Sequence, residues 1–166
     1  MLIIFSGLPG AGKTTIAREL ARHLTAVHLR VDSIEQAIRD FGVPQPLNDI
    51  GYRVGYAVAA DNLLIGQTVI ADSVNPLQLT RDAWLAVALR AGTAAAEVEI
   101  TCSNQKLHRQ RLEMRPMEIK GLKSPTWEEV VSRKYEPWSR EHIVIDTAEK
   151  NVAEIVRELG EVFSKR

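Results

Sequence analysis

A glycine-rich segment near the start of the chain has residue types suited to holding a phosphate. Its sequence over Gly7–Thr14, GLPGAGKT, fits the pattern of a phosphate-binding loop and lies between an apolar run and a helical pattern. Glycines let the backbone turn its N–H groups inward around an anion, and the following helix directs its positive end at the same place. Lys13 can reach the β- and γ-phosphates of a nucleoside triphosphate, and the Thr14 hydroxyl can bind Mg²⁺. The alternative, a glycine-rich turn that only begins a helix, explains less of the pattern.

The segment therefore predicts that ATP and Mg²⁺ bind here. The nucleotide-binding residues that it predicts are Gly7, Gly10, Ala11, Gly12, Lys13, Thr14 and Thr15.

Three aspartates follow β-rich runs: Asp32, Asp72 and Asp146. Ligands of open parallel sheets bind beyond the carboxyl ends of the strands, so all three are candidates for a site. Ser33 begins a capping-box pattern that ends at Gln36, and with Ser33 as the helix N-cap, Asp32 is left free at the end of its strand. The alternative for each aspartate is a helix cap or a solvated loop carboxylate.

A basic pattern over residues 105–115 predicts a helix on which Arg111 and Arg115 share one face. Guanidinium groups bind phosphate in a forked geometry and stabilise charge on a transferred phosphoryl group. We expect these two arginines to close over the triphosphate from a lid at about residues 109–126, and we expect Arg111 to contact the nucleotide. The alternative is a solvated basic face that pairs with neighbouring glutamates.

The surrounding pattern alternates strands with helices, which is typical of a parallel sheet covered by helices on both faces. The second strand alternates polar and apolar residues, which places it at or near a sheet edge. We predict a helix that starts at Asn75-Pro76 and could restart near Thr80, and a second capping box at Thr126. The predicted strands are Leu2–Phe5, Val27–Val31, Thr68–Ala71, Ala96–Thr101 and Ile143–Ile145.

Composition limits the classes of protein to consider. The 166 residues suit a single domain spanning 1–166, and 21 basic against 21 acidic residues give no net charge, which makes nucleic acid an unlikely partner. The single cysteine, Cys102, has no internal disulfide partner and fits a reducing, cytoplasmic setting. No apolar run approaches the ~20 residues of a membrane span. Composition leaves the oligomeric state open.

The sequence lacks the motifs of two familiar classes of triphosphate-binding protein, the GTPases and the motor ATPases. The segment after the fourth strand, TCSNQKLH, lacks the aspartate of the Asn-Lys-x-Asp pattern that reads guanine. The third strand ends in VIADS, without the second acid that would activate water in a motor ATPase. A small kinase is the commonest of the remaining options at this chain length.

Phrases spread over nearly the whole chain strengthen this interpretation. The phrases are IIFSGLPGAGKTTIARELA, VHLRVDSIEQA, VIADSVNP, HRQRLEMR, PTWEEVVSRKYEPW and VIDTA. In them the chain resembles the small P-loop kinases related to nucleoside-monophosphate kinases, such as adenylylsulfate, gluconate and shikimate kinases, chloramphenicol phosphotransferase and the kinase domain of polynucleotide kinases. More closely, it resembles a bacterial group described as predicted kinases or AAA-type ATPases. The resemblance implies a three-layer α/β fold with a five-stranded parallel sheet of order 2-3-1-4-5 and an arginine-bearing lid.

The resemblance also implies roles for individual residues. Asp32 falls where related kinases carry an aspartate that contacts the acceptor hydroxyl, as a general base or as an orienting group. Asp72 falls at the position that holds Mg²⁺ through water or shares in acceptor binding, and the two roles could be exchanged. Arg111 corresponds to a lid arginine near the adenine or the phosphates, and Arg115 to a phosphate-contacting one. The acceptor signatures of gluconate and shikimate kinases are absent, so the acceptor is not identified.

One further helix could face the acceptor. Tyr52 and Tyr56 are one turn apart, with Arg53 between them, and Arg53 could bind an anionic or polar acceptor. The alternative is that the tyrosines pack in the core and Arg53 is a surface ion.

The leading hypothesis is therefore an ATP-dependent kinase that phosphorylates a hydroxyl of a small molecule, with Lys13, Asp32, Asp72, Arg111 and Arg115 in catalytic roles. Two alternatives remain: a nucleotide-binding ATPase or switch that acts through a partner, and a kinase of polynucleotide ends.

Overall fold

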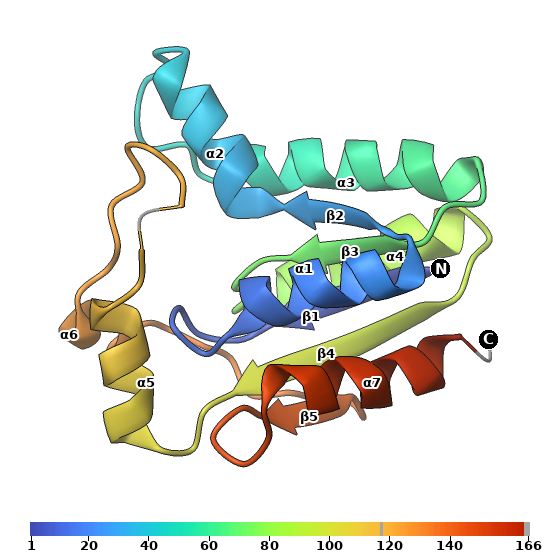
Figure 1. Cartoon of the computed structure of the whole chain (residues 1–166). Helices are drawn as coiled ribbons and strands as arrows, with labels where there is room; N and C mark the ends of the chain where they lie inside the picture. The colour runs from blue at the N-terminus through green and yellow to red at the C-terminus, as the bar shows by residue number, and fades with distance from the viewer. Residues whose placement is uncertain (117, 165–166) are drawn as a thin grey trace.

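The computed structural model describes residues 1–116 and 118–164 and alternates strands with helices as expected. Figure 1 shows the strands side by side, with their arrowheads directed to the end of the molecule where α5 and α6 lie. The elements are β1 (Leu2–Ser6), α1 (Lys13–Leu24), β2 (Val27–Arg30), α2 (Val31–Asp40), α3 (Ile50–Leu64), β3 (Val69–Asp72), α4 (Gln78–Arg90), β4 (Ala95–Thr101), α5 (Gln105–Glu113), α6 (Trp127–Val131), β5 (Ile143–Asp146) and α7 (Val152–Phe163).

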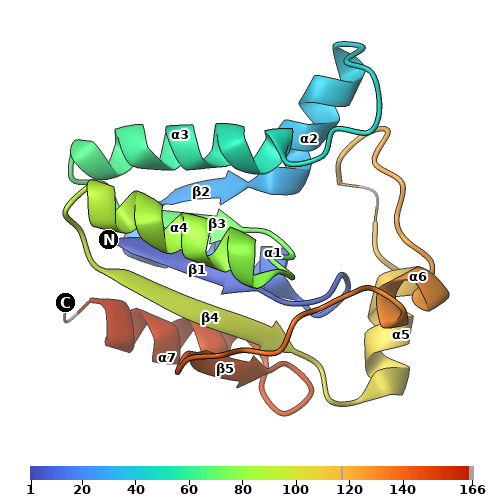
Figure 2. The same ribbon diagram turned by 180° about the vertical axis from the view of Figure 1, so that it is seen from behind.

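The sheet is parallel throughout, and its order is β2-β3-β1-β4-β5. This confirms the predicted fold class and strand order, including the edge position of β2. Helices α1 and α7 cover one face, and α3 and α4 cover the other, as the two opposite views in Figures 1 and 2 show.

The central strand β1 divides the core into two clusters because its side chains alternate between the two faces. Ile3 and Phe5 pack towards α1 and α7, while Leu2 and Ile4 pack towards α3 and α4, where Trp84 is fully buried. All five residues of β1 are buried, as a continuous apolar run in a covered parallel sheet requires. The P-loop, which follows β1, therefore begins from a fully buried central strand.

The start of α2 differs from the prediction. Strand β2 ends at Arg30, which is the N-cap, and the helix begins directly at Val31. Ser33 therefore lies inside the helix and caps nothing. Asp32 lies in the first turn of α2, where the positive end of the helix dipole stabilises a carboxylate.

The start of α4 also differs. Asn75 is buried in a left-handed conformation (φ 47°), and its side-chain amide donates a hydrogen bond to the Ser6 hydroxyl over 3.0 Å. The N-cap is Leu77, and the helix continues unbroken from Gln78. Asn75 therefore holds the end of β1 against the β3–α4 loop and does not cap a helix. The predicted capping box at Thr126 is confirmed.

Helix α5 is shorter than predicted. It ends at Glu113 with Met114 as its C-cap, so Arg115 lies in the following loop and shares no helix face with Arg111. Arg115 precedes Pro116, and a residue before proline is disfavoured in the helical conformation. Among the described residues, none of the helices is both long enough and apolar enough to cross a lipid bilayer.

Candidate functional site

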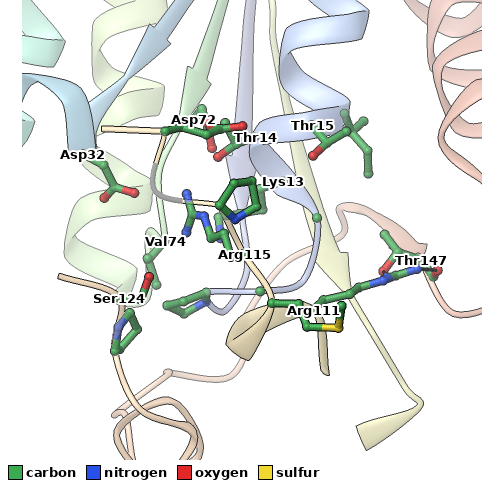
Figure 3. Close-up of a pocket in the computed structure, with 18 of the residues that line it drawn as sticks. Lys13, Thr14, Thr15, Asp32, Asp72, Val74, Arg111, Arg115, Ser124 and Thr147 are labelled. Atoms are coloured by element: carbon green, nitrogen blue, oxygen red, sulfur yellow. Dashed lines mark hydrogen bonds between the residues drawn. The ribbon is translucent and has the colours of Figure 1, made fainter. Parts of the chain in front are cut away.

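A cavity of about 1350 Å³ opens at the carboxyl ends of the strands, where the fold brings distant segments together. The P-loop and the start of α1 form its floor. The ends of β2 and β3 lead into one wall, the loop after α5 forms the opposite wall, and the start of α7 closes one side. The candidate side chains line this cavity except Arg53, Asp146 and the buried parts of the P-loop. Asp146 instead accepts hydrogen bonds from the backbone N–H groups of Ser103 and Ala148, as a loop carboxylate does. Figure 3 shows ten of the residues that line the cavity with labels.

The P-loop glycines have conformations that require glycine. Gly7, Gly10 and Gly12 have φ values of 137°, 85° and 101°, in the left-handed region. A side chain on Gly7 would also collide with the carbonyl oxygen of Ile100 on β4. Gly12 is the N-cap of α1 and offers no capping side chain, and the first turn of the helix holds no acidic residue. The N–H groups at this helix start are therefore directed to a ligand that accepts hydrogen bonds.

Lys13 places a positive charge above this loop. Its side chain is buried, with 7% of the residue exposed, and its Nζ donates a hydrogen bond to the Leu8 carbonyl over 3.0 Å. Burial lowers the pKa of Lys13 to about 8, and the charges of Asp72 and Asp32 offset part of this effect. An anion bound beside the ammonium group would restore its usual pKa.

Asp72 lies at the end of β3 beside Thr14, as Figure 3 shows, and is 2% exposed. Its Oδ2 lies 3.2 Å from Nε2 of His28 on the edge strand β2. Burial alone would raise the pKa of Asp72, but the hydrogen bond from His28, the charge of Lys13 and the Thr14 hydroxyl outweigh it and hold the pKa below its ordinary value. Asp72 is therefore a buried carboxylate that stays ionised next to the P-loop.

The oxygen atoms of Thr14 and Asp72 fit the requirements of Mg²⁺. Hydroxyl and carboxylate oxygens are hard ligands, and Mg²⁺ in nucleotide sites takes one or two such groups and completes its shell with water and phosphate oxygens. Over residues 1–116 and 118–164, no group of three or more histidine, cysteine, aspartate or glutamate side chains could hold a metal. The donor set of Thr14 and Asp72 is suited to a metal that arrives with a nucleotide.

Asp32 lies across the cavity from the P-loop. Figure 3 shows its carboxylate directed into the space in front of Lys13. Its charge acts on Lys13, and within the described part of the chain its side chain has no hydrogen-bond or ion-pair partner. The structure thus brings Asp32 into the cavity from the first turn of a helix, although the predicted route was the open end of a strand.

The two predicted lid arginines have different surroundings. Arg111 donates hydrogen bonds to the hydroxyl and the carbonyl of Thr147 over 2.8 and 3.1 Å, and the Thr147 hydroxyl in turn donates to the Ala11 carbonyl over 2.9 Å. Arg111 therefore joins α5 to the β5–α7 loop and the P-loop. Figure 3 shows Arg115 on the other side, between Asp32 and Lys13.

Arg53 takes no part in the cavity. Its side chain is 74% exposed on α3 and pairs with Asp49 one turn earlier over 2.7 Å. The apolar side of α3 packs on the sheet, so position 53 faces solvent. The tyrosines beside it contribute to the core, where the Tyr56 ring meets Trp84 edge-on at 4.6 Å between centroids. The structure therefore gives no support to acceptor binding by Arg53 and agrees with the alternative, in which Arg53 is a surface ion.

Sequence reasoning missed three contributors. Arg133, within the phrase SRKYEPW, lines the cavity, and its charge acts on Lys13. Glu118, in the predicted lid, pairs with Arg18 of α1 and Arg30 of β2 over 2.8 and 3.0 Å. The only signal in the sequence was that acidic and basic residues are mixed around both positions. The pairing of Arg18 with Glu118 joins residues 100 positions apart, and no local sequence pattern predicts it.

The third contributor is Arg81, which is fully buried and contacts two of the quoted phrases of the sequence, SVNP and YEPW. Its guanidinium group donates to the carbonyl groups of Asn75, Pro76, Glu136 and Pro137 over 2.9–3.3 Å. It also stacks over the Trp138 ring, 4.0 Å from the centroid. Arg81 therefore fixes the loop after β3 to the segment that follows α6, and so helps to shape the cavity wall.

Comparisons with known proteins agree with this geometry. The family described as AAA domain matches residues 2–133. No match was found among curated protein sequences. A putative kinase from Chloroflexus aurantiacus has a similar structure, with a TM-score of 0.73, 21% identity and 96% of both chains covered.

Two further solved structures contain nucleotide analogues. The Mycobacterium tuberculosis APS kinase CysC, in complex with AMPPNP and APS, gives a TM-score of 0.73 at 20% identity, over 98% of this chain and 96% of that one. Chaetomium thermophilum Kti12, in complex with ADP-AlF3, gives a TM-score of 0.70 at 22% identity, over 97% of this chain and 98% of that one. At these identities the likeness establishes the fold, which is the one predicted from the resemblance to small P-loop kinases. Together with the match over most of its length, this shows that the chain belongs to the AAA domain family.

Proposed function

We propose that the protein transfers the γ-phosphate of ATP to a hydroxyl group of a small molecule. The observation that carries the proposal is the position of Asp32, a carboxylate without an ion-pair partner among the described residues, which faces the P-loop lysine across a cavity of about 1350 Å³. A protein that only binds or hydrolyses a nucleotide does not need a carboxylate at this place. The kinases among the similar solved structures support the same interpretation.

The nucleotide would lie along the P-loop. Its β- and γ-phosphates would accept hydrogen bonds from the start of α1 and from Lys13. Arg111 and the β5–α7 loop at Thr147 form the wall on the side away from Asp32, which suits the base and ribose. The γ-phosphate would then point towards Asp32.

The acceptor would lie between Asp32 and the loop after α5. Asp32 would accept the proton of the acceptor hydroxyl as that oxygen forms a bond to the γ-phosphorus, and the bond from phosphorus to the β–γ bridging oxygen would break to release ADP. Arg115 and Arg133 would stabilise the negative charge on the transferred group. The enzyme would act mainly by positioning and by charge stabilisation.

Thr14 and Asp72 would hold Mg²⁺, directly or through water. When bound, the ion would neutralise charge on the β- and γ-phosphate oxygens. Asp72 is less suited than Asp32 to act as the base, because His28, Lys13 and Thr14 already surround its carboxylate.

The test is a screen of hydroxyl compounds with Mg-ATP that detects phosphorylated product by mass spectrometry or phosphorus NMR, and not ADP alone. We expect transfer to at least one compound and loss of transfer in Asp32→Asn, with nucleotide binding unchanged. Asp61→Asn, which removes an exposed carboxylate on α3, is the matched control. Full transfer by Asp32→Asn would exclude Asp32 as the base.

Two other outcomes would replace the proposal. ATP turnover that no acceptor changes, together with a bound partner protein, would indicate a nucleotide-dependent switch. Phosphate transfer to oligonucleotide ends, with binding that weakens steeply as salt increases, would indicate a polynucleotide kinase.

A further inference from the structure

The contact between His28 and Asp72 joins a residue outside the cavity to one inside it. Strands β2 and β3 are parallel, and their register places Arg30 opposite Asp72 and His28 opposite Ile70. Arg30 is thus the direct neighbour of Asp72, yet its Nη1 bonds to Glu118. The partner of Asp72 is instead His28, two residues earlier on the same face of β2.

His28 lies on the outer side of Asp72. Of the described residues, those that line the cavity include Asp72, Lys13 and Thr14 but not His28. His28 borders a separate shallow depression at the sheet edge, together with Arg18 and Arg30. His28 is thus outside the cavity lining, and its contact with the site runs through Asp72.

The hydrogen bond from His28 reaches one of the two oxygens of the Asp72 carboxylate. Oδ2 accepts the hydrogen bond from His28, so Nε2 carries the hydrogen, because an ionised carboxylate only accepts. A hydrogen bond at one oxygen limits the rotation of the carboxylate, and Thr14, which Figure 3 shows beside Asp72, approaches the same carboxylate from the cavity.

The type of residue at position 28 matters as well. A guanidinium group in the same place would bring a permanent positive charge and compete with a cation for the carboxylate. An imidazole can donate one hydrogen bond without carrying a charge. We propose that His28 is a positioning residue that orients Asp72 for the divalent cation of the metal–nucleotide complex.

This inference rests on the nucleotide and metal part of the proposed function and needs no acceptor. The probe is Mn²⁺, which prefers the same oxygen ligands as Mg²⁺ and is counted directly by electron paramagnetic resonance. The intact protein is saturated with AMPPNP, and free Mn²⁺ is titrated. The result therefore stands even if the screen for a phosphorylated product fails.

His28→Met and His28→Gln form a matched pair, because the two side chains have the same length and only glutamine donates a hydrogen bond. We expect His28→Met to weaken Mn²⁺ binding about 10- to 100-fold, the usual effect of removing a hydrogen bond to a metal-binding side chain. We expect His28→Gln to retain most of the affinity. Binding of AMPPNP without metal should be unchanged in both.

His23→Gln is the control for loss of a histidine, since His23 is exposed on α1. Circular dichroism and thermal unfolding check that each variant folds, and His28→Phe replaces His28→Met if the latter does not. Unchanged Mn²⁺ affinity in the variant that cannot donate would overturn the inference. An equal loss in His28→Gln would overturn it too, because the hydrogen bond would then not be the cause.

Discussion

Burial of Lys13 should make nucleotide binding depend on pH at and above pH 8. The pKa of Lys13 is lowered to about 8 by burial, although Asp72 and Asp32 act in the opposite direction. A bound triphosphate places several negative charges beside the ammonium group and should return its pKa to about 10.5 or above. Above pH 8 the complex therefore holds more protons than the free protein, and rising pH opposes binding.

The size of the effect follows from the pKa. Between pH 7 and pH 9 the protonated fraction of Lys13 in the free protein falls from about 90% to about 10%. In the complex Lys13 stays protonated over the same range. The dissociation constant of AMPPNP should therefore rise about tenfold, which corresponds to about 1.4 kcal/mol.

Isothermal titration calorimetry at pH 7, 8 and 9, in buffers with different ionisation enthalpies, measures both the affinity and the protons taken up. We expect uptake of about 0.9 proton per nucleotide at pH 9. Lys13→Arg is the control, because arginine stays charged throughout and its affinity should change little with pH. The reasoning fails if the wild-type affinity is the same at pH 7 and pH 9, or if Lys13→Arg shows the same decrease.

Three predictions concern stability, measured by urea denaturation. Gly7→Ala should lower the free energy of unfolding by about 3 kcal/mol, because the new Cβ would collide with the backbone of Ile100. Gly42→Ala is the control, since Gly42 also has a positive φ but lies in open space, and it should lower the free energy of unfolding by only about 1 kcal/mol. Equal losses in the two variants would contradict this. Arg81→Met should cost about 2–4 kcal/mol because it leaves buried carbonyl groups without a donor, and a cost below 1 kcal/mol would show that they find other partners. Lys13→Met should stabilise the protein by about 1–3 kcal/mol at pH 7, since it removes a buried charge. That gain should shrink as pH rises through 8, where the folded wild type loses the charge and the unfolded chain keeps it; a gain that does not depend on pH would argue against burial as its cause.

The errors in the sequence analysis have identifiable physical causes. The capping-box pattern at Ser33 was overridden because β2 ends at Arg30 and its last residue already serves as the N-cap. The predicted helix around Arg111 was too long because Arg115 precedes a proline. The sequence left Arg53 open between acceptor binding and a surface ion, because periodicity identifies a helix but not which of its faces meets the sheet. In each case the local sequence pattern is present, but residues outside the pattern determine the structure that forms there.

The sequence by itself determined the features that depend on neighbouring residues. The P-loop is contiguous, and its function follows from backbone conformations that only glycine adopts easily, so Gly7–Thr14 could be recognised without a structure. The strands could be located because each is a short apolar run, and their order followed from the family resemblance. Asp72 could be predicted to lie at the site because ligands of such a sheet bind beyond the carboxyl ends of its strands.

Only the tertiary structure decided which distant side chains meet. His28 and Asp72 are 44 residues apart and become partners through the register of two strands. Arg81 reaches a segment 55 residues later, and Glu118 reaches back to Arg18 across the mouth of the cavity. Such contacts depend on how the layers pack and not on local propensity, because hydrogen-bond geometry is set by the positions of whole elements. The phosphate-binding loop could thus be predicted from eight consecutive residues, Gly7–Thr14. The contact of His28 with Asp72 could not be predicted, because the fold brings these two residues together.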